Sequence, residues 1–478
     1  MPVQTSSASQ PVTPQRSATK LSERSWALSA WCVVAAFGAY ASMYAFRKPF
    51  TAGTYTTAPF GAGFKTWLVL AQVLGYTISK FIGIKVIAEM PPQRRATTLL
   101  GFVVAAHLAL LLFALVPSPY NIACLFLNGL PLGMVFGLVL GFLEGRRMTE
   151  AFVAGLCASF ILADGFTKSV GAYLLQAGVR EQWMPFWAGT IFLLPLVGFV
   201  WMLQRIPAPS AQDIAARSAR APMQRAERWA MFRRHAPGLV AITLAYLLVT
   251  VLRSMRADFA PELWAGLGAK AQPGVFTSSE VFVALGVIAV NALVVLVRDN
   301  RRAFFLGLGT ALGGLSLIVV VLWAQGLGWV APFPFMVLLG FGLYLPYVAV
   351  HTTVFERLIA MTRDRANIGY LMYLSDAFGY LGYVAVMVAK NFWKVEGDLL
   401  PLFKMTGWVV ALASIAALLV AIVFFGRGRT SLAPEPRLQA NAITLHSTLG
   451  NFTSPVLYRP ESSHCDGAGP GRPIERAN

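Results

Sequence analysis

The sequence contains few charged residues for its length. Only 13% of its 478 residues are Asp, Glu, Lys or Arg, whereas 56% are hydrophobic, and the mean hydropathy is +0.62. A soluble domain of this length needs a much more polar surface, so the composition excludes a soluble globular protein. We therefore predict a protein that crosses a membrane several times.

Cysteine is also scarce, with four residues in the whole chain. Cys32, Cys124 and Cys157 lie in separate apolar segments and Cys465 lies in a polar tail, so their spacing fits neither a disulfide framework nor a zinc site. The sequence has no nucleophilic triad pattern and no Walker-type phosphate loop. We predict no catalytic residue, no metal, no cofactor and no enzymatic activity.

Acidic residues number 21 against 39 Lys and Arg, which gives a formal charge of +18. A basic excess often marks a nucleic-acid-binding protein, but here the positive charge is concentrated in every second loop between apolar segments, as at Arg94-Arg95 and Arg301-Arg302. This is the positive-inside pattern of membrane proteins. It predicts a lipid bilayer rather than nucleic acid as partner, and a multi-pass protein of the cell inner membrane with both termini in the cytoplasm.

Long apolar runs are what the sequence has in abundance. Twelve segments are long enough to cross a bilayer as helices, and they begin near Trp26, Trp67, Thr97, Asn121, Ala151, Met184, Pro237, Thr277, Ala303, Pro334, Asn367 and Pro401. We predict an all-α membrane protein with twelve transmembrane helices in two six-helix bundles, 25–203 and 237–426. A basic cytoplasmic connection, 204–236, joins them, and disordered cytoplasmic segments flank them at 1–24 and 427–478.

The two halves repeat one another. Ala39-Tyr40 is followed by Arg47 in the first apolar segment, and Ala245-Tyr246 is followed by Arg253 in the seventh. Asp164-Gly-Phe and Asp376-Ala-Phe form a second matching pair. Parallel six-helix repeats are typical of the major facilitator architecture, which binds its substrate between the halves.

The repeated arginines indicate the kind of substrate. An arginine at the centre of a membrane costs about 2.5 to 3.5 kcal/mol on insertion scales, so a symmetric pair suggests a shared anionic ligand. Guanidinium groups bind oxyanions with two hydrogen bonds, while lysines and phenols complete the shell, and a phosphate or phosphate ester compensates the positive charge better than a monocarboxylate. The candidate substrate-binding residues are Arg47, Arg253, Lys80, Lys168, Tyr40, Tyr44, Tyr76, Tyr344 and Tyr380.

Structural roles are alternatives for each candidate. Arg47, Arg253 and Lys80 can extend to the membrane interface, and the tyrosines can be packing or aromatic-belt residues. His351 shares a helix face with Tyr344 and is interpreted as a hydrogen-bonded packing histidine.

The intramembrane acids also have two interpretations. Asp164 and Asp376 can relay protons or form ion pairs, and Lys168 is the obvious partner of Asp164 at i, i+4. Arg256 and Asp258 can form an external gate or an ordinary salt bridge at a helix end.

Five segments carry related motifs in a fixed order: Tyr40-x3-Tyr44-Ala-Phe-Arg47, Gly75-Tyr76-x2-Ser79-Lys80, Tyr246-x6-Arg253, Gly340-Phe341-x2-Tyr344 and Phe378-Gly379-Tyr380. Together they resemble the organophosphate/phosphate antiporter family of the major facilitator superfamily, to which the glycerol-3-phosphate transporters belong. The resemblance implies that Arg47 and Arg253 hold the phosphate, and that inorganic phosphate is exchanged for a phosphate ester as the two halves rock. The chain departs from the family at Lys168-Ser-Val-Gly171, where the family has a histidine.

We therefore predict a monomeric secondary active transporter that moves a small-molecule anion, an organic phosphate or similar multivalent anion, by alternating access and in exchange for inorganic phosphate. One alternative is a proton-coupled carrier of a cationic or zwitterionic solute that uses Asp164 and Asp376. Another is a transporter-like sensor that binds a phosphate ester without carrying it.

Overall fold

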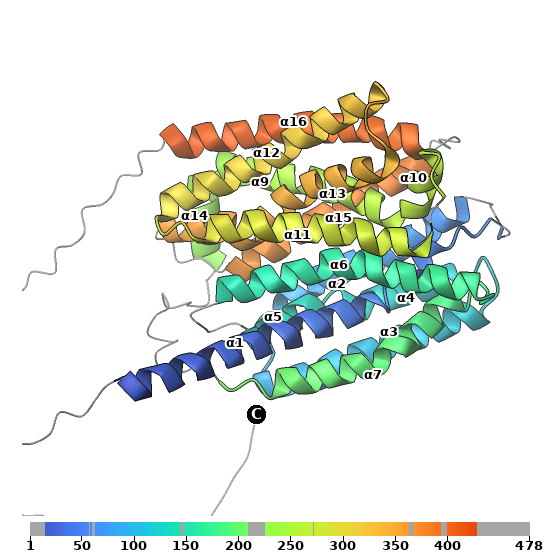
Figure 1. The fold of residues 1–478 in the computed structure, drawn as a ribbon, viewed down its shortest axis with the longest axis horizontal. Coiled ribbons are helices and arrows are strands. Elements are labelled where there is room, and N and C mark those ends of the chain that lie inside the picture. Colours follow the sequence, from blue (N-terminus) through green and yellow to red (C-terminus); the bar gives the residue numbers. More distant parts are fainter. Residues whose placement is uncertain are drawn as a thin grey trace, which may run out of the picture. The chain divides into compact units, whose positions relative to one another are not determined.

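The computed structural model describes residues 15–56, 58–59, 63–143, 146, 149–208, 225–270, 272–362, 368–392 and 399–427. These residues form helices joined by short turns, and they contain no β-strand (Figure 1). All of them belong to one unit, residues 1–430. The predicted all-α fold is confirmed.

The first half of the chain forms seven helices in the described residues. They are α1 (Gln15–Tyr44), α2 (Gly63–Glu89), α3 (Arg95–Leu115), α4 (Ile122–Leu132), α5 (Val135–Leu143), α6 (Thr149–Gln176) and α7 (Met184–Gln204). Short 3-10 turns lie at η1 (Pro49–Ala52) and η2 (Pro92–Arg94). One predicted apolar segment is divided into α4 and α5, with Pro131 inside the last turn of α4.

The second half contains a similar series. It comprises α9 (Arg225–Asp258), α10 (Ala260–Gly266), α11 (Pro273–Val295), α12 (Asn300–Gly326), α13 (Pro332–Ala349), a π-helical turn η3 (Val350–Val354), α14 (Phe355–Thr362), α15 (Ile368–Phe392) and α16 (Leu399–Arg427). The start of α1 and the end of α16 lie at the same end of the helices (Figure 1).

Eleven segments of the described chain are long and apolar enough to cross a membrane. The twelfth predicted segment is α2, in which Lys65, Gln72 and Lys80 lower the hydropathy. Its 27 residues nevertheless extend about 40 Å, which is enough to cross a bilayer.

Two helices begin earlier than predicted. Helix α1 begins at Gln15, so residues 15–24, which we expected to be disordered, are helical. They contain neither Pro nor Gly, so the helix continues outward from its apolar part. Helix α9 begins at Arg225 and takes in the last part of the basic connection. The rest of that connection between 209 and 224, and the predicted disordered segments 1–14 and 428–478, lie outside the described residues.

Helices α2 and α4 approach each other closely. A Cβ atom at Gly129 of α4 would lie 2.1 Å from the carbonyl oxygen of Gln72, and one at Gly133 would lie 2.6 Å from that of Tyr76. Only glycine permits this contact between backbones. Because Tyr76 and Lys80 project from α2, the contact fixes their position relative to α4.

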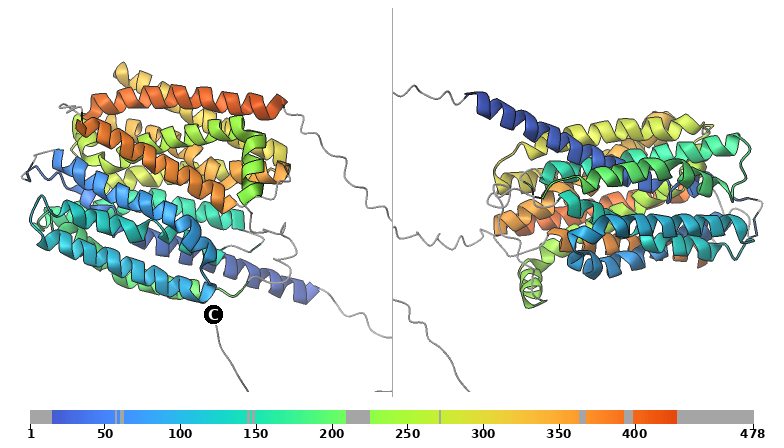
Figure 2. Two further views of the ribbon diagram at one scale, coloured as in Figure 1. Left: turned by 180° about the vertical axis from the view of Figure 1, so that it is seen from behind. Right: turned by 90° about the horizontal axis from the view of Figure 1, so that it is seen from below.

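The two halves meet along two helix pairs. Helix α6 packs against α11, and α2 packs against α15. The first pair is visible in Figure 1, and the second can be followed in the left view of Figure 2. The predicted binding residues lie on these helices and on α1, α9 and α13, except Arg47, which follows the end of α1.

Candidate functional site

The sequence spacing suggested that Arg47 lies on the first helix. In the structure it lies in a turn just after α1. Its backbone N–H donates to the carbonyl of Tyr44 at 3.0 Å, and its own carbonyl accepts from the side-chain amide of Gln72 at 3.0 Å. Asn128 donates to the carbonyl of Phe46 at 3.0 Å and accepts from Gln72 at 2.8 Å. Polar side chains of α2 and α4 therefore hold the turn.

The guanidinium of Arg47 faces aromatic rings. Its central carbon lies 3.8 Å from the ring centroid of Tyr76, 5.5 Å from that of Tyr380 and 5.9 Å from that of Tyr44. Cation–π attraction stabilises this arrangement. The residue is only 3% exposed, so its side chain does not extend to the outside.

Arg253 occupies a comparable environment in the second half. It lies on α9, is 6% exposed, and its guanidinium is 4.4 Å from the ring centroid of Tyr347 and 5.9 Å from that of Tyr344. One of its terminal nitrogens donates to the hydroxyl of Tyr380 at 3.3 Å. Tyr380 of α15 is therefore beside both guanidinium groups, one from each half.

Charge pairing sets these two arginines apart. Five of the eight buried Lys and Arg side chains in the described residues are in ion pairs, and Arg146, in the loop after α5, donates to the Pro207 carbonyl. Arg47 and Arg253 are the other two: no described carboxylate lies within 4.0 Å of either, and their Nε atoms have no hydrogen-bond partner. The five pairs are Lys48–Asp258, Lys65–Glu262, Lys80–Asp376, Lys168–Asp164 and Arg256–Glu280.

Lys80 is paired across the two halves. Its Nζ lies 2.8 Å from a carboxylate oxygen of Asp376. The other oxygen of Asp376 accepts hydrogen bonds from Tyr246 and, at 3.4 Å, from Tyr347, and lies 3.5 Å from Nε2 of His351. Lys80 is therefore bound to an acid in this conformation and does not point freely toward the arginines.

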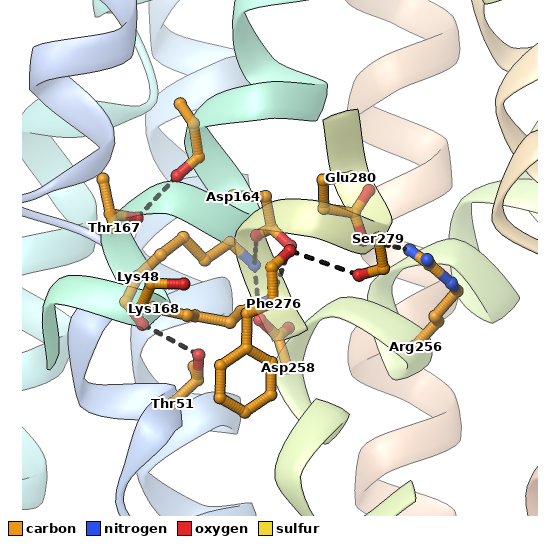
Figure 3. A network of polar contacts seen from close by, with 12 residues as sticks. Lys48, Thr51, Asp164, Thr167, Lys168, Arg256, Asp258, Phe276, Ser279 and Glu280 are labelled. Atoms are coloured by element: carbon orange, nitrogen blue, oxygen red, sulfur yellow. Dashed lines mark hydrogen bonds and ion pairs between the residues drawn. The ribbon is translucent and has the colours of Figure 1, made fainter. Parts of the chain in front are cut away.

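A second group of charges joins the halves through η1, α6 and α9 (Figure 3). Lys168 and Asp164 form the i, i+4 ion pair that was one of the two predicted alternatives. Lys48 lies 3.6 Å from Asp164 and is hydrogen-bonded to Asp258 of α9. Tyr383 donates to the second oxygen of Asp258 at 3.1 Å. We call Lys48, Asp164, Lys168 and Asp258 the four-charge cluster.

The predicted pairing of Arg256 with Asp258 is wrong. Arg256 donates instead to Glu280 of α11 at 2.7 Å and to the carbonyl of Met336 at 3.0 Å, whereas Asp258 binds Lys48. Residues two positions apart on a helix face different directions, so Arg256 and Asp258 are poorly placed to pair with each other.

Most of the predicted tyrosines lie beside the arginines. Tyr44, Tyr76, Tyr344 and Tyr380 contact a guanidinium, as described above. Tyr40 does not contact a guanidinium. Its aromatic ring packs against those of Tyr44 and Phe136, with centroid distances of 5.5 Å and 5.4 Å.

Four residues of this region were absent from the predicted binding set: Lys48, Tyr246, Tyr347 and His351. Two signals were present in the sequence, because Lys48 follows Arg47 directly and Tyr347 shares a helix face with Tyr344 and His351. The partnership of Lys48 with Asp258, 210 positions away, has no local signal.

Two cavities lie among the helices, and the smaller one borders these residues. The smaller, of ≈ 10 Å³, has room for about one water molecule and is lined by Lys80, Phe136, Leu140, His351, Met372, Tyr373 and Asp376. The larger, of ≈ 350 Å³, is mostly apolar and lies between α6 and α11. The described residues contain no His, Cys, Asp and Glu group able to hold a metal, and Cys32, Cys124 and Cys157 are free.

The architecture is the major facilitator fold. A crystal structure of a D-xylose-proton symporter has a TM-score of 0.56 and 15% identity to this chain, covering 82% of this chain and 97% of the symporter. A mutant of the nucleoside transporter NupG has a TM-score of 0.53 and 12% identity, covering 83% of this chain and 100% of NupG. At such low identities the structural similarity establishes the fold alone. It confirms the predicted all-α fold with two helix bundles. Both structures are of transporters.

Residues 49–428 match the model described as "Family of unknown function (DUF5690)", and the chain belongs to this family. The matched range includes Lys80, Arg253 and Tyr380, whereas Tyr44 and Arg47 precede it. No curated protein matches the chain.

Proposed function

We propose that the protein is a secondary active transporter of a doubly charged organic anion, an organic phosphate, which it exchanges for inorganic phosphate by alternating access. The observation that supports this proposal is the pair of buried arginines without carboxylate partners, one in each half, with Tyr380 beside both.

The number of uncompensated charges favours a dianion. Leaving a buried charge without a partner costs several kcal/mol, so two unpaired guanidinium groups create a strong preference for a ligand with two negative charges. A phosphate ester carries about −1.5 to −2 at pH 7 and offers three oxygens that accept hydrogen bonds. Its oxygens can replace the Tyr380 hydroxyl as the acceptor for Arg253.

The pairing of the buried carboxylates disfavours a cationic substrate. All four buried carboxylates of the described residues, Asp164, Asp258, Glu280 and Asp376, already have a Lys or Arg partner. A cationic solute would have to displace one of these fixed cations. The similar structures are of a D-xylose-proton symporter and a nucleoside transporter. They support transport as the class of function, and the charge pattern of this chain supports an anionic substrate.

The position of the arginines in different halves suggests how binding is linked to movement. A phosphate held by Arg47 and Arg253 together bridges the two bundles, and it draws them together around the site. Release then requires the bundles to separate on the other side, which in this fold is a rocking movement.

The experiment is exchange of labelled phosphate in proteoliposomes that contain the full-length chain and a glycerol phosphate or hexose phosphate on the opposite side. Arg47→Lys and Arg253→Lys keep the charge and lose the two-pronged hydrogen bonding. A charge-assisted hydrogen bond contributes about 1.5 to 3 kcal/mol, so we expect exchange to fall about 10- to 100-fold in each variant.

Arg302→Lys is the matched control, because Arg302 is exposed at the start of α12. It should exchange phosphate like the wild type. Wild-type exchange in both Arg47→Lys and Arg253→Lys would refute the phosphate site. Stabilisation of the protein by phosphate esters without any exchange would instead identify a sensor.

A further inference from the structure

The carboxylate of Asp376 is surrounded by hydrogen-bond donors from both halves of the chain. Lys80, on α2, comes from the first half of the chain. Tyr246, Tyr347 and His351, on α9, α13 and η3, come from the same half as Asp376 itself. Asp376 is 6% exposed and His351 is 5% exposed, so bulk water does not solvate either of them.

This arrangement leaves Asp376 without a cation whenever the halves separate between α2 and α15. Lys80 then moves away with the first half, while Asp376 stays buried in the second. A buried carboxylate that loses its partner is costly, by an amount that typically exceeds the cost of protonating a nearby histidine. His351 is the one described side chain next to Asp376 in that half that can become a cation near neutral pH.

The hydrogen bonding of His351 is suited to this role. Its Nδ1 lies 3.0 Å from the carbonyl oxygen of Tyr347, and a carbonyl only accepts, so Nδ1 carries the hydrogen of the neutral ring. The lone pair of Nε2 therefore faces the Asp376 carboxylate at 3.5 Å and the Tyr246 hydroxyl at 3.4 Å. A proton on Nε2 converts this contact from a repulsive one into an ion pair.

A small cavity lies beside the ring. Its volume is ≈ 10 Å³, it is lined by Lys80, His351, Asp376 and Tyr373, and it accommodates about one water molecule. A water molecule there could pass a proton to Nε2, next to the same carboxylate that Lys80 leaves.

Among the other elements packed against η3, α6 carries Asp164, which is paired with Lys168, and α14 carries Glu356. Helix α12 has only Arg301 and Arg302 as titratable side chains, both exposed, and α14 has Glu356 and Arg357, both partly exposed. Helix α6 contributes the thiol of Cys157, close enough to interact electrostatically with Asp376. The charged or titratable groups around the ring are therefore Asp376, Lys80, Tyr246, Tyr347, Tyr373 and Cys157.

We propose that Nε2 of His351 is the proton-binding site that couples transport to a proton, and that this proton and Lys80 alternate as the counter-ion of Asp376. The proton binds as the Lys80–Asp376 pair separates, giving an imidazolium–carboxylate pair, and it leaves as Lys80 returns. The inference rests on the proposed transport function and adds its coupling ion.

The test uses the full-length protein in proteoliposomes and measures exchange of labelled glycerol phosphate at equal pH on both sides, from pH 5.5 to 8. It also measures uptake into vesicles that carry an imposed pH gradient. The variant is His351→Gln, which keeps a hydrogen-bonding side chain that cannot be protonated. His107→Gln is the control, since His107 on α3 stacks on Phe186, away from Asp376.

We expect wild-type exchange to fall at least tenfold between pH 6 and pH 8, because fewer protons are then available to replace Lys80 as the counter-ion, and we expect a pH gradient to drive accumulation. His351→Gln should keep only the pH dependence that comes from ionisation of the substrate and should lose accumulation, while His107→Gln should behave like the wild type. The substrate itself ionises near pH 6, so the difference between wild type and His351→Gln is the decisive quantity.

Two results would overturn the proposal: a wild-type exchange rate that does not depend on pH, or a His351→Gln variant whose pH profile and accumulation match the wild type. The first needs no variant, so it is decisive even if His351→Gln does not fold. Failure of the transport function itself is distinct, because the wild type would then show no exchange at any pH.

Discussion

Replacing Asp258 by Asn tests whether the four-charge cluster holds the two halves together near η1. In the structure Asp258 of α9 binds Lys48 and accepts from Tyr383, and Lys48 is buried. The substitution leaves a buried lysine that shares Asp164, 3.6 Å away, with Lys168.

The magnitude follows from this residual contact. Removing one partner of a buried ion pair costs about 3 to 5 kcal/mol. Since Asp164 still compensates part of the charge, we take the lower end, about 3 kcal/mol, which shifts the equilibrium toward the separated state about 100-fold.

The assay is alkylation of a cysteine introduced at Thr51, which is fully buried beside Lys48, in a chain whose four native cysteines are replaced by alanine. A membrane-impermeant maleimide should label Thr51→Cys at least tenfold faster when Asp258→Asn is also present. The double exchange Lys48→Asp with Asp258→Lys retains two cations and two anions in the cluster, so it should restore slow labelling. Equal labelling rates with and without Asp258→Asn would show that the cluster does not close this end.

Two further predictions follow from the packing. Glu262→Gln removes the partner of Lys65, but the Glu262 side chain is 28% exposed, so we expect less than a tenfold rise in the same labelling rate; a rise as large as that of Asp258→Asn would contradict the ranking by burial. Gly129→Val places a side chain where a Cβ would lie 2.1 Å from the Gln72 carbonyl, and we expect it to lower the free energy of unfolding by more than about 3 kcal/mol, seen as a reduced melting temperature in detergent. Gly101→Ala is its control, because nothing lies within 4 Å of that position, and equal melting temperatures would show that α2 and α4 are not held in contact.

The fold was accessible from the sequence because it depends on patterns that are local. Apolar runs and alternating basic loops predicted the helices, and the repeat of Arg47 and Arg253 predicted two similar halves. The one weak segment was α2, where Gln72 and Lys80 reduce the apolarity of the helix because they serve contacts with other helices.

The site was only partly accessible, for a physical reason. Spacing along one helix gave the Lys168–Asp164 pair as one alternative and placed His351 on the same face as Tyr344, since residues three or four apart share a face. The pairs Lys48–Asp258 and Lys80–Asp376 join residues 210 and 296 positions apart, and no local pattern encodes them. Which cations lack a partner became visible only once these distant pairs were known.

The backbone contact between α2 and α4 has a consequence for substrate selectivity. Gln72 ties the Arg47 turn to α2, and glycine brings α2 directly onto α4, so Arg47, Tyr76 and Lys80 belong to one closely packed unit of the first half. Arg253 belongs to the second half. Under the proposed function, the distance between these two units, rather than the conformation of any single side chain, would set which phosphate esters fit.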